Sequence, residues 1–258
     1  MILRKVKRLF SAFVILLFPS FVATRILRLI GHRIDKGCKL GFSCILTDRL
    51  LLKKGARIGH LNFIKTTSLL MWENATIGRM NIMHGPVDIL IGRASIIGNA
   101  NKVVRGPQGE VSVGRATLKL GKLSSFTAGH RIDCTRSVRL GNYTTVAGVG
   151  TQIWTHGYIH DLTGPGRYRI DGEVNIGSNV YVGASCVFSM GVTIGEGVII
   201  GAGTNVGKSI LEAGLYFSSV LRKLPRPINP DLRPDLLLQT DKQLCERVYL
   251  KMVPNADE

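Results

Sequence analysis

The stretch from Ile170 to Ile210 reads IDGEVNIGSNVYVGASCVFSMGVTIGEGVIIGAGTNVGKSI and repeats every six residues. Each hexad opens with an aliphatic or aromatic anchor: Ile170, Ile176, Val182, Phe188, Ile194, Ile200 and Val206. Glycine follows five of these seven anchors, and a mostly compact or β-branched residue stands four positions after each: Val174, Val180, Cys186, Val192, Val198, Thr204 and Ile210. A period of six fits neither an α-helix nor a two-faced strand, and it is typical of a hexapeptide β-solenoid.

The repeat predicts a triangular coil in which each hexad forms one short face. Three hexads, about 18 residues, close one turn. Each anchor points inward and stacks on the anchor of the next coil, roughly 4.8 Å away. We expect the compact residue to fit inside the corner and the glycine to allow a positive φ there. Because one coil cannot bury its own anchors, stability comes from stacked neighbours.

The same spacing continues through most of the upstream sequence. Its further anchors are Ile34, Leu40, Leu46, Leu52, Ile58, Ile64 and Leu70 and, after slips of one or two residues, Ile77, Met83, Ile89, Ile91, Ile97, Val103, Leu120, Phe126, Ile132, Val138, Leu140 and Val146. Breaks in the pattern predict loops at residues 104–112 and 152–169.

These patterns predict an all-β fold, a parallel β-helix of hexapeptide repeats over residues 34–212. Residues 1–33 form an N-terminal helix and residues 213–258 a C-terminal extension in this prediction. A short helix is expected near Leu236–Lys251.

The N-terminal segment combines an apolar run with flanking cations. The run Leu9–Thr24 contains Pro19 and falls short of the about 17–25 residues that span a bilayer. Basic residues flank it on both sides: Arg4, Lys5, Lys7, Arg8, Arg25, Arg28, Arg33 and Lys36. We expect an interfacial helix that binds an anionic membrane surface through residues 1–33, at the cytoplasmic face of the cell membrane. A helix that caps the first coil is the alternative.

The composition limits the classes of molecule that the protein is expected to bind. The formal net charge of +17 is compatible with nucleic acid, an anionic membrane or phosphorylated ligands. Nucleic acid is excluded because the basic residues are scattered and no recognised nucleic-acid-binding motif appears. The five cysteines have no C-x-x-C spacing, so they are interpreted as structural thiols in a reducing compartment.

The predicted loop at 152–169 holds the candidate chemistry. It contains Trp154 and the sequence THGYIHD, with His156, His160 and Asp161. A histidine can take a proton from a hydroxyl at neutral pH, which acyl transfer to an alcohol requires.

The loop, the hexad run after it and the segment GAGTNVGKS together resemble the sugar O-acetyltransferases of the hexapeptide-repeat superfamily, of the galactoside, capsule and O-antigen type. The resemblance implies a left-handed coil, a homotrimer, acetyl-CoA as co-substrate and no metal. It also implies that His156 is the general base and that a backbone N–H at a glycine corner stabilises the oxyanion. The expected acceptor is a sugar or lipid-linked saccharide of cell-surface polysaccharide biosynthesis.

The same resemblance suggests roles for further residues. His130 and Asp133 are expected beside His156 in catalysis, and Trp154, His160, Asp161 and Thr127 at the acceptor. His160 and Asp161 are alternatively expected to orient His156. The expected contacts of coenzyme A are Gly201, Ala202, Gly203, Thr204, Lys208, Arg222 and Lys223.

Two other functions stay open on the sequence. His130, His156 and His160 invite comparison with the three-histidine metal site of γ-class carbonic anhydrases. A solenoid without catalytic activity that acts as a scaffold is the second alternative.

Overall fold

The structure is a computed structural model that describes residues 2–107, 112–160, 163, 165, 167–217, 222–224, 236–242 and 246–251. The chain divides into two units, Met1–Lys223 and Leu224–Glu258. The first holds two helices and the coils, and the second holds a strand pair.

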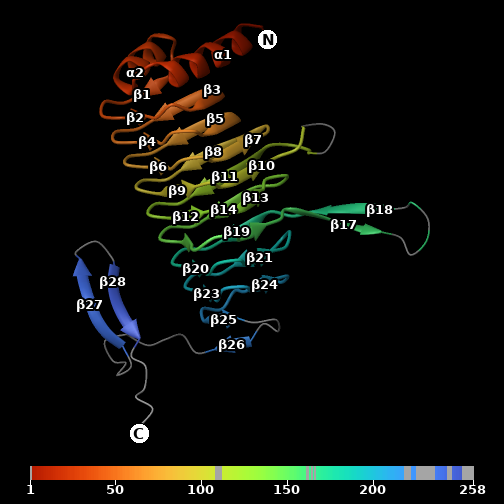
Figure 1. The fold of residues 1–258 in the computed structure, drawn as a ribbon. Helices are drawn as coiled ribbons and strands as arrows, with labels where there is room; N and C mark the ends of the chain where they lie inside the picture. The colour runs from red at the N-terminus through yellow and green to blue at the C-terminus, as the bar shows by residue number, and fades with distance from the viewer. Residues whose placement is uncertain are drawn as a thin grey trace. The chain divides into compact units, whose positions relative to one another are not determined.

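The first unit is a coil of parallel strands that forms three faces (Figure 1). Face 1 contains β7 (Ile82–His84), β10 (Lys102–Val104), β13 (Arg131–Asp133), β16 (Gln152–Ile153), β21 (Val187–Phe188) and β24 (Asn205–Val206). Face 2 contains β1 (Arg33–Ile34), β8 (Val87–Ile91), β11 (Ala116–Leu120), β14 (Val138–Leu140), β19 (Val174–Ile176) and β22 (Thr193–Ile194). Face 3 contains β2 (Lys39–Leu40), β4 (Arg57–Ile58), β6 (Thr76–Ile77), β9 (Ile96–Asn99), β12 (Ser125–Ala128), β15 (Thr145–Val146), β20 (Tyr181–Val182), β23 (Ile199–Ile200) and β25 (Leu215–Phe217).

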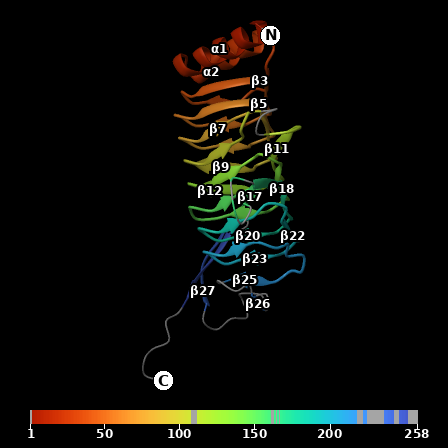
Figure 2. The ribbon, with the colours of Figure 1, turned by 90° about the vertical axis from the view of Figure 1, so that its right-hand side faces the viewer.

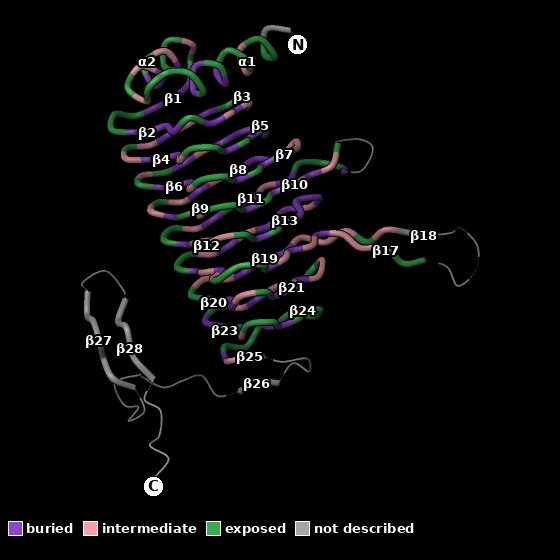
Figure 3. Tube along the Cα trace, viewed as in Figure 1, coloured by how far each residue is buried: buried purple, intermediate pink, exposed green. Residues whose placement is uncertain are grey.

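Register confirms the hexad pattern where it is cleanest. Tyr181 pairs with Ile199 and Val187 with Asn205, so each of these coils is 18 residues long. The anchors from Ile176 to Val206 and the compact residues from Val174 to Ile210 are all buried. Figure 3 shows the same alternation of buried and exposed positions along successive coils.

Three predicted anchors are wrong. Two strands, β3 (Cys44–Leu52) and β5 (Phe63–Met71), run without a break from face 1 into face 2, and coils there are 19 residues long, as the pairing of Arg57 with Thr76 shows. This shift leaves Leu46 and Leu70 half-buried and turns Ile45, Leu69 and Met71 inward instead. Ile170 is 40% exposed because it belongs to an excursion rather than to a coil.

Glycine is required after each anchor for a different reason from the positive φ that the sequence predicted. These glycines do not have positive φ; positive φ occurs two residues later, for instance at Asn179 and Gly197. A Cβ on Gly141 would lie 2.5 Å from the carbonyl carbon of Gly177 in the next coil. Glycine is therefore required because stacked corners approach too closely for a side chain.

Two helices, α1 (Ile2–Leu17) and α2 (Ser20–Leu29), cover the N-terminal end of the coil (Figure 2). Val14, Ile15, Ala23 and Leu27 are buried in the same hydrophobic cluster as the first anchors. The buried Ser11 hydroxyl and His32 Nε2 are 2.9 Å apart. Capping of the first coil was the alternative to membrane binding in the sequence analysis. In the structure, one face of the helix pair caps the first coil and the other face is exposed.

The chain leaves the coil in two excursions, and both begin at the corner between faces 1 and 2, hereafter the 1–2 corner. The first follows β10, and residues 108–111 of the loop predicted there lie outside the described residues. The second is an antiparallel pair, β17 (His156–His160) and β18 (Arg167–Asp171), which replaces the predicted loop and projects away from the coils (Figure 1). Gln152 and Ile153 still belong to a coil, so this excursion starts later than predicted.

The C-terminal prediction needs correction. The coil continues past residue 212, because β25 pairs with β23. After it comes β26 (Arg222–Leu224). In the second unit, β27 (Leu236–Lys242) and β28 (Glu246–Lys251) form an antiparallel pair where a helix was expected.

Candidate active site

A buried carboxylate lies at the 1–2 corner. Asp133 ends β13 and is 8% exposed. Its Oδ1 accepts hydrogen bonds from the Thr135 amide at 3.2 Å and the Thr135 hydroxyl at 2.9 Å. Its Oδ2 accepts from the Thr155 amide at 3.0 Å and the Thr155 hydroxyl at 2.5 Å. Burial alone would raise the pKa of Asp133, but the hydrogen bonds from Thr155, His156 and Thr135 outweigh it and hold the pKa below its usual range.

His156 is the group that this carboxylate positions. It opens β17 one coil after Asp133, and its Nδ1 lies 2.8 Å from Asp133 Oδ2. Because an ionised carboxylate can only accept, Nδ1 carries a proton, so that in the neutral ring Nε2 has the lone pair. The imidazole is 25% exposed and the carboxylate 10%. The pair is therefore an oriented imidazole with a basic nitrogen available to a ligand.

Aromatic rings flank the imidazole on both sides. The ring centroids of Trp154 and Tyr158 lie 6.5 and 6.0 Å from that of His156, each nearly perpendicular to it. Trp154 donates from Nε1 to Gln152, and the Arg131 guanidinium lies 5.5 Å from the Trp154 ring centroid. Such rings provide apolar surface next to the imidazole.

His130 and Thr127 lie at a different corner, between faces 3 and 1. His130 is 1% exposed, its Nδ1 accepts from the Thr151 amide at 3.2 Å, and its Nε2 lies 3.1 Å from the Thr127 hydroxyl. Burial lowers the pKa of His130, which favours the neutral ring. Both nitrogens are thus engaged inside the coil, and the structure gives this histidine a structural place rather than the expected catalytic one.

The glycine-rich segment expected to contact coenzyme A also lies at the corner between faces 3 and 1. The amides of Gly201 and Gly203 donate to carbonyls of adjacent coils at 2.8 Å each. Thr204 is buried and its hydroxyl donates to the Gly201 carbonyl, whereas Ala202 is exposed. Apart from Ala202, these residues are engaged within the coil.

Of the expected cations, Lys208 is exposed and stands two residues after the anchor Val206, at the 1–2 corner. Strand pairing places Val206 beside Phe188, and Phe188 beside Ile153. Lys208 therefore lies two coils from Thr155, roughly 10 Å along the edge. Lys223 is paired with Glu212, and the side chain of Arg222 lies outside the described residues.

The two loop residues expected to orient His156 or to bind the acceptor are His160 and Asp161. His160 is exposed at the far end of β17, and Asp161 lies outside the described residues. Sequence reasoning missed Thr135 and Thr155. They were missed because residues 152–169 were assigned to a loop, whereas Ile153 pairs with Ile132 and so brings Thr155 into the coil next to Asp133.

Within the residues that the structure describes, no three His, Cys, Asp or Glu side chains are grouped to hold a metal ion. Neither described helix is long and apolar enough to cross a lipid bilayer.

The coil and its register define the class of the fold as a parallel β-helix of hexapeptide repeats, as predicted. Among solved structures, it is similar to that of the polySia specific acetyltransferase NeuO, with a TM-score of 0.52 and 18% identity over 72% of this chain and 84% of that one. Other matches are the polysialic acid O-acetyltransferase OatWY, with a TM-score of 0.43 and 15% identity over 75% and 83% of the two chains, and AntD, an N-acyltransferase from Bacillus cereus, with 0.38 and 17% over 83% and 93%. No protein-family model and no curated protein sequence matches this chain.

Proposed function

We propose that the protein is an acyltransferase that moves an acetyl group from acetyl-CoA to a sugar hydroxyl. The observation that carries the proposal is the hydrogen bond from His156 to Asp133, which leaves Nε2 basic beside two aromatic rings. The likeness of the fold to that of a polysialic acid acetyltransferase supports the same chemistry.

In the proposed reaction, His156 Nε2 accepts the proton of the acceptor hydroxyl while the oxygen attacks the thioester carbonyl carbon. The new C–O bond forms, the C–S bond breaks, and the departing thiolate of coenzyme A takes the proton back from Nε2. Asp133 stays ionised and stabilises the imidazolium between the two transfers. A backbone N–H at a glycine corner would stabilise the oxyanion.

Coenzyme A is placed along the 1–2 corner in this proposal. Lys208 provides the cation for its phosphates on the same edge as His156. Ala202 and its neighbours lie at another corner, so they would reach the same ligand only from a neighbouring subunit. We therefore propose a homotrimer in which the two corners face each other across a groove.

The helical cap is proposed to place the enzyme on an anionic membrane, at the cytoplasmic face. Its outward surface exposes large apolar side chains: Val6, Leu9, Phe10, Phe13, Leu16, Leu17, Phe18, Phe21 and Leu29. Exposed cations accompany them, including Arg4, Lys5 and Arg25. Apolar side chains bordered by cations suit the interface of an anionic bilayer. A lipid-linked or polymeric saccharide at that surface is the proposed acceptor.

The test is release of free coenzyme A from acetyl-CoA with a panel of saccharides. We expect thiol release that depends on the saccharide and a matching gain of 42 Da, about the mass of one acetyl group less a proton, in the saccharide. Absence of transfer to every cell-surface saccharide, including lipid-linked ones, would overturn the proposal.

A further inference from the structure

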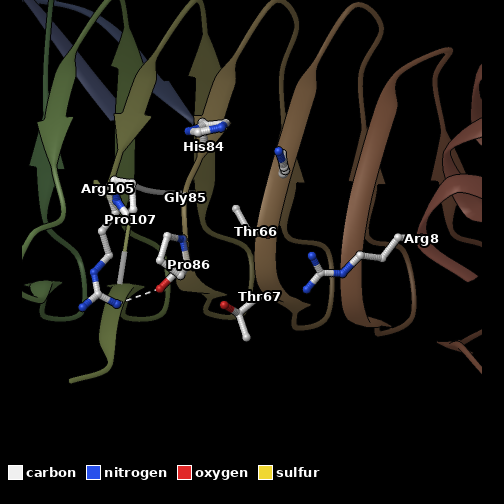
Figure 4. Close-up of a pocket in the computed structure, with 9 residues that line it drawn as sticks. Arg8, Thr66, Thr67, His84, Gly85, Pro86, Arg105 and Pro107 are labelled. Carbon is white, nitrogen blue, oxygen red and sulfur yellow. Dashed lines mark hydrogen bonds between the residues drawn. The ribbon is translucent and has the colours of Figure 1, made fainter. Parts of the chain in front are cut away.

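A cavity lies on the 1–2 corner, between helix α1 and the start of the first excursion. Its volume is about 240 Å³, and its polar lining comprises Arg8, Lys65, Thr66, Thr67, His84 and Arg105. Figure 4 shows Arg8 and Arg105 on opposite sides of the two threonines. Among the described residues that line the cavity there is no aspartate or glutamate.

The charge on Arg105 lacks a bonded counter-ion in the described part of the chain. The residue is 2% exposed, and its guanidinium donates only to neutral carbonyls, those of Pro86 at 2.7 Å, Gly114 at 2.7 Å and Val113 at 3.4 Å. Its Nε is buried and finds no hydrogen-bond partner within the part of the chain that the structure describes. A buried cation is expensive unless a partner of opposite charge accompanies it.

Lys65 adds a second cation, exposed and without an ion pair among the described residues. Arg8, by contrast, is paired with Asp48. The lining of the cavity therefore includes a guanidinium, an ammonium, an imidazole and two threonines, of which Thr66 is buried and donates its hydroxyl to the Ser68 carbonyl at 3.5 Å. That donor set suits a phosphate or diphosphate, which carries several negative charges and several acceptor oxygens.

Strand register connects this cavity to the candidate active site. Lys65 pairs with His84, His84 with Val104, and Val104 with Asp133. His84 and Asp133 are thus two strands apart on one row, roughly 10 Å at about 4.8 Å a strand. A molecule anchored in the cavity by one end would extend along the corner to His156.

We infer that this cavity binds the phosphate or diphosphate group of the acceptor, so that the acceptor is a phosphorylated saccharide. The inference rests on the proposed acyl transfer for its place in the reaction, but the binding of the anion does not depend on it. Two sources share the chemistry: a nucleoside diphosphate sugar in solution and a diphosphate-linked saccharide held in a membrane.

The first experiment titrates the full chain with inorganic pyrophosphate in a calorimeter. Lys65→Ala is the main variant because its side chain is exposed and its loss leaves the coil intact. The second variant is Arg105→Lys, which keeps the positive charge and removes the forked N–H donors of the guanidinium. Each is expected to weaken binding by about tenfold or more. The matched control is Lys119→Ala, an exposed lysine on face 2, with affinity within about twofold of the wild type.

The second experiment compares the two sources as acceptors, with the same saccharide lacking phosphate as reference. Lys65→Ala is expected to raise KM about tenfold for the source that the protein uses and to leave kcat unchanged. The phosphate-free saccharide should show no difference between the two proteins. No pyrophosphate binding by the wild type, or equal binding by Lys65→Ala, would overturn the inference. If pyrophosphate binding depends on Lys65 but no saccharide is acylated, the cavity assignment stands and the proposed function fails.

Discussion

At the residue scale, Asp133 determines what His156 can do. The carboxylate accepts from two threonines and from the imidazole, and it would hold His156 in the tautomer with a basic Nε2. Neither threonine was expected to matter, yet both come from adjacent coils and complete the hydrogen bonding of a buried charge. The proposed base is therefore positioned by stacking of coils rather than by its own loop.

We predict that Asp133→Asn lowers kcat/KM by a factor on the order of 10²–10⁴, because an amide can donate to Nδ1 and stabilise the wrong tautomer. Asp88→Asn is the matched control, since Asp88 is equally buried at 8% exposure but lies on face 2. Steady-state acyl transfer measures both. Equal activity losses in the two variants would indicate a general structural effect and contradict the assigned role.

The same carboxylate makes a pH-dependent contribution to stability. Its pKa in the folded protein lies below the value of about 3.9 in an unfolded chain. The ionised form therefore stabilises the fold above that pH, and the contribution is lost as the pH falls through the folded-state pKa. In urea titrations, the difference in free energy of unfolding between wild type and Asp133→Asn should be largest near neutral pH and should shrink in acid. A difference that does not change down to pH about 3 would contradict this.

At the scale of elements, close stacking of the corners fixes where glycine is needed. A Cβ on Gly141 would lie 2.5 Å from the backbone of Gly177 and Ser178, whereas a Cβ on Gly207 would meet nothing within 4 Å. We predict that Gly141→Ala destabilises the protein by about 1–3 kcal/mol, the usual cost of overpacking. Gly207→Ala, which also replaces the glycine after an anchor, should have little effect. Thermal or urea unfolding of both variants checks this, and equal stabilities would contradict the packing argument.

The helical cap contains a titratable group of its own. Burial, followed by the nearby Lys7, lowers the pKa of His32 from 6.5 to about 4. The unfolded chain thus binds a proton at a higher pH than the folded one, so stability falls as the pH drops from about 6.5 toward 4. Replacement by glutamine, His32→Gln, should flatten this slope in urea titrations followed by circular dichroism. An unchanged slope would show that His32 does not carry the effect.

At the scale of the whole first unit, the proposals place the cap surface and the 1–2 corner in one functional arrangement. The cap would contact the membrane, the basic cavity would hold the phosphorylated end of the acceptor, and His156 would act farther along the same edge. In this arrangement, an anionic membrane and a phosphorylated ligand would be the partners of a chain with a net charge of +17.

Flotation with vesicles containing phosphatidylglycerol tests the membrane contact. The triple variant Leu9→Gln, Phe13→Gln and Leu17→Gln keeps the inner face of the cap and should bind about tenfold more weakly or worse. A control with Ile96→Gln, Leu123→Gln and Tyr181→Gln changes exposed side chains on or beside face 3 and should bind normally. Undiminished binding by the cap variant would contradict the contact. Deletion of the cap would be less informative, because it uncovers buried residues such as Ile34 and Leu40.

The sequence predicted the fold best where the hexad repeat is uninterrupted. Hexads from Ile176 to Val206 predicted the coil because every anchor there faces inward. The rule failed at Leu46 and Leu70, where long strands pass through a corner, and near Leu236–Lys251, where no repeat guided the prediction. His156 was identified by its position in a break of the repeat. Its contact with Asp133 requires the three-dimensional register, which sequence spacing alone did not reveal.

The most direct test of the central claim compares two histidines on the same projecting strand pair. In acyl transfer from acetyl-CoA to an active saccharide, His156→Ala should lower kcat by a factor on the order of 10²–10⁴. His160→Ala removes an exposed imidazole four residues away and should retain nearly full activity. Near-normal turnover by His156→Ala, or equal losses in both variants, would contradict the assignment of His156 as the general base.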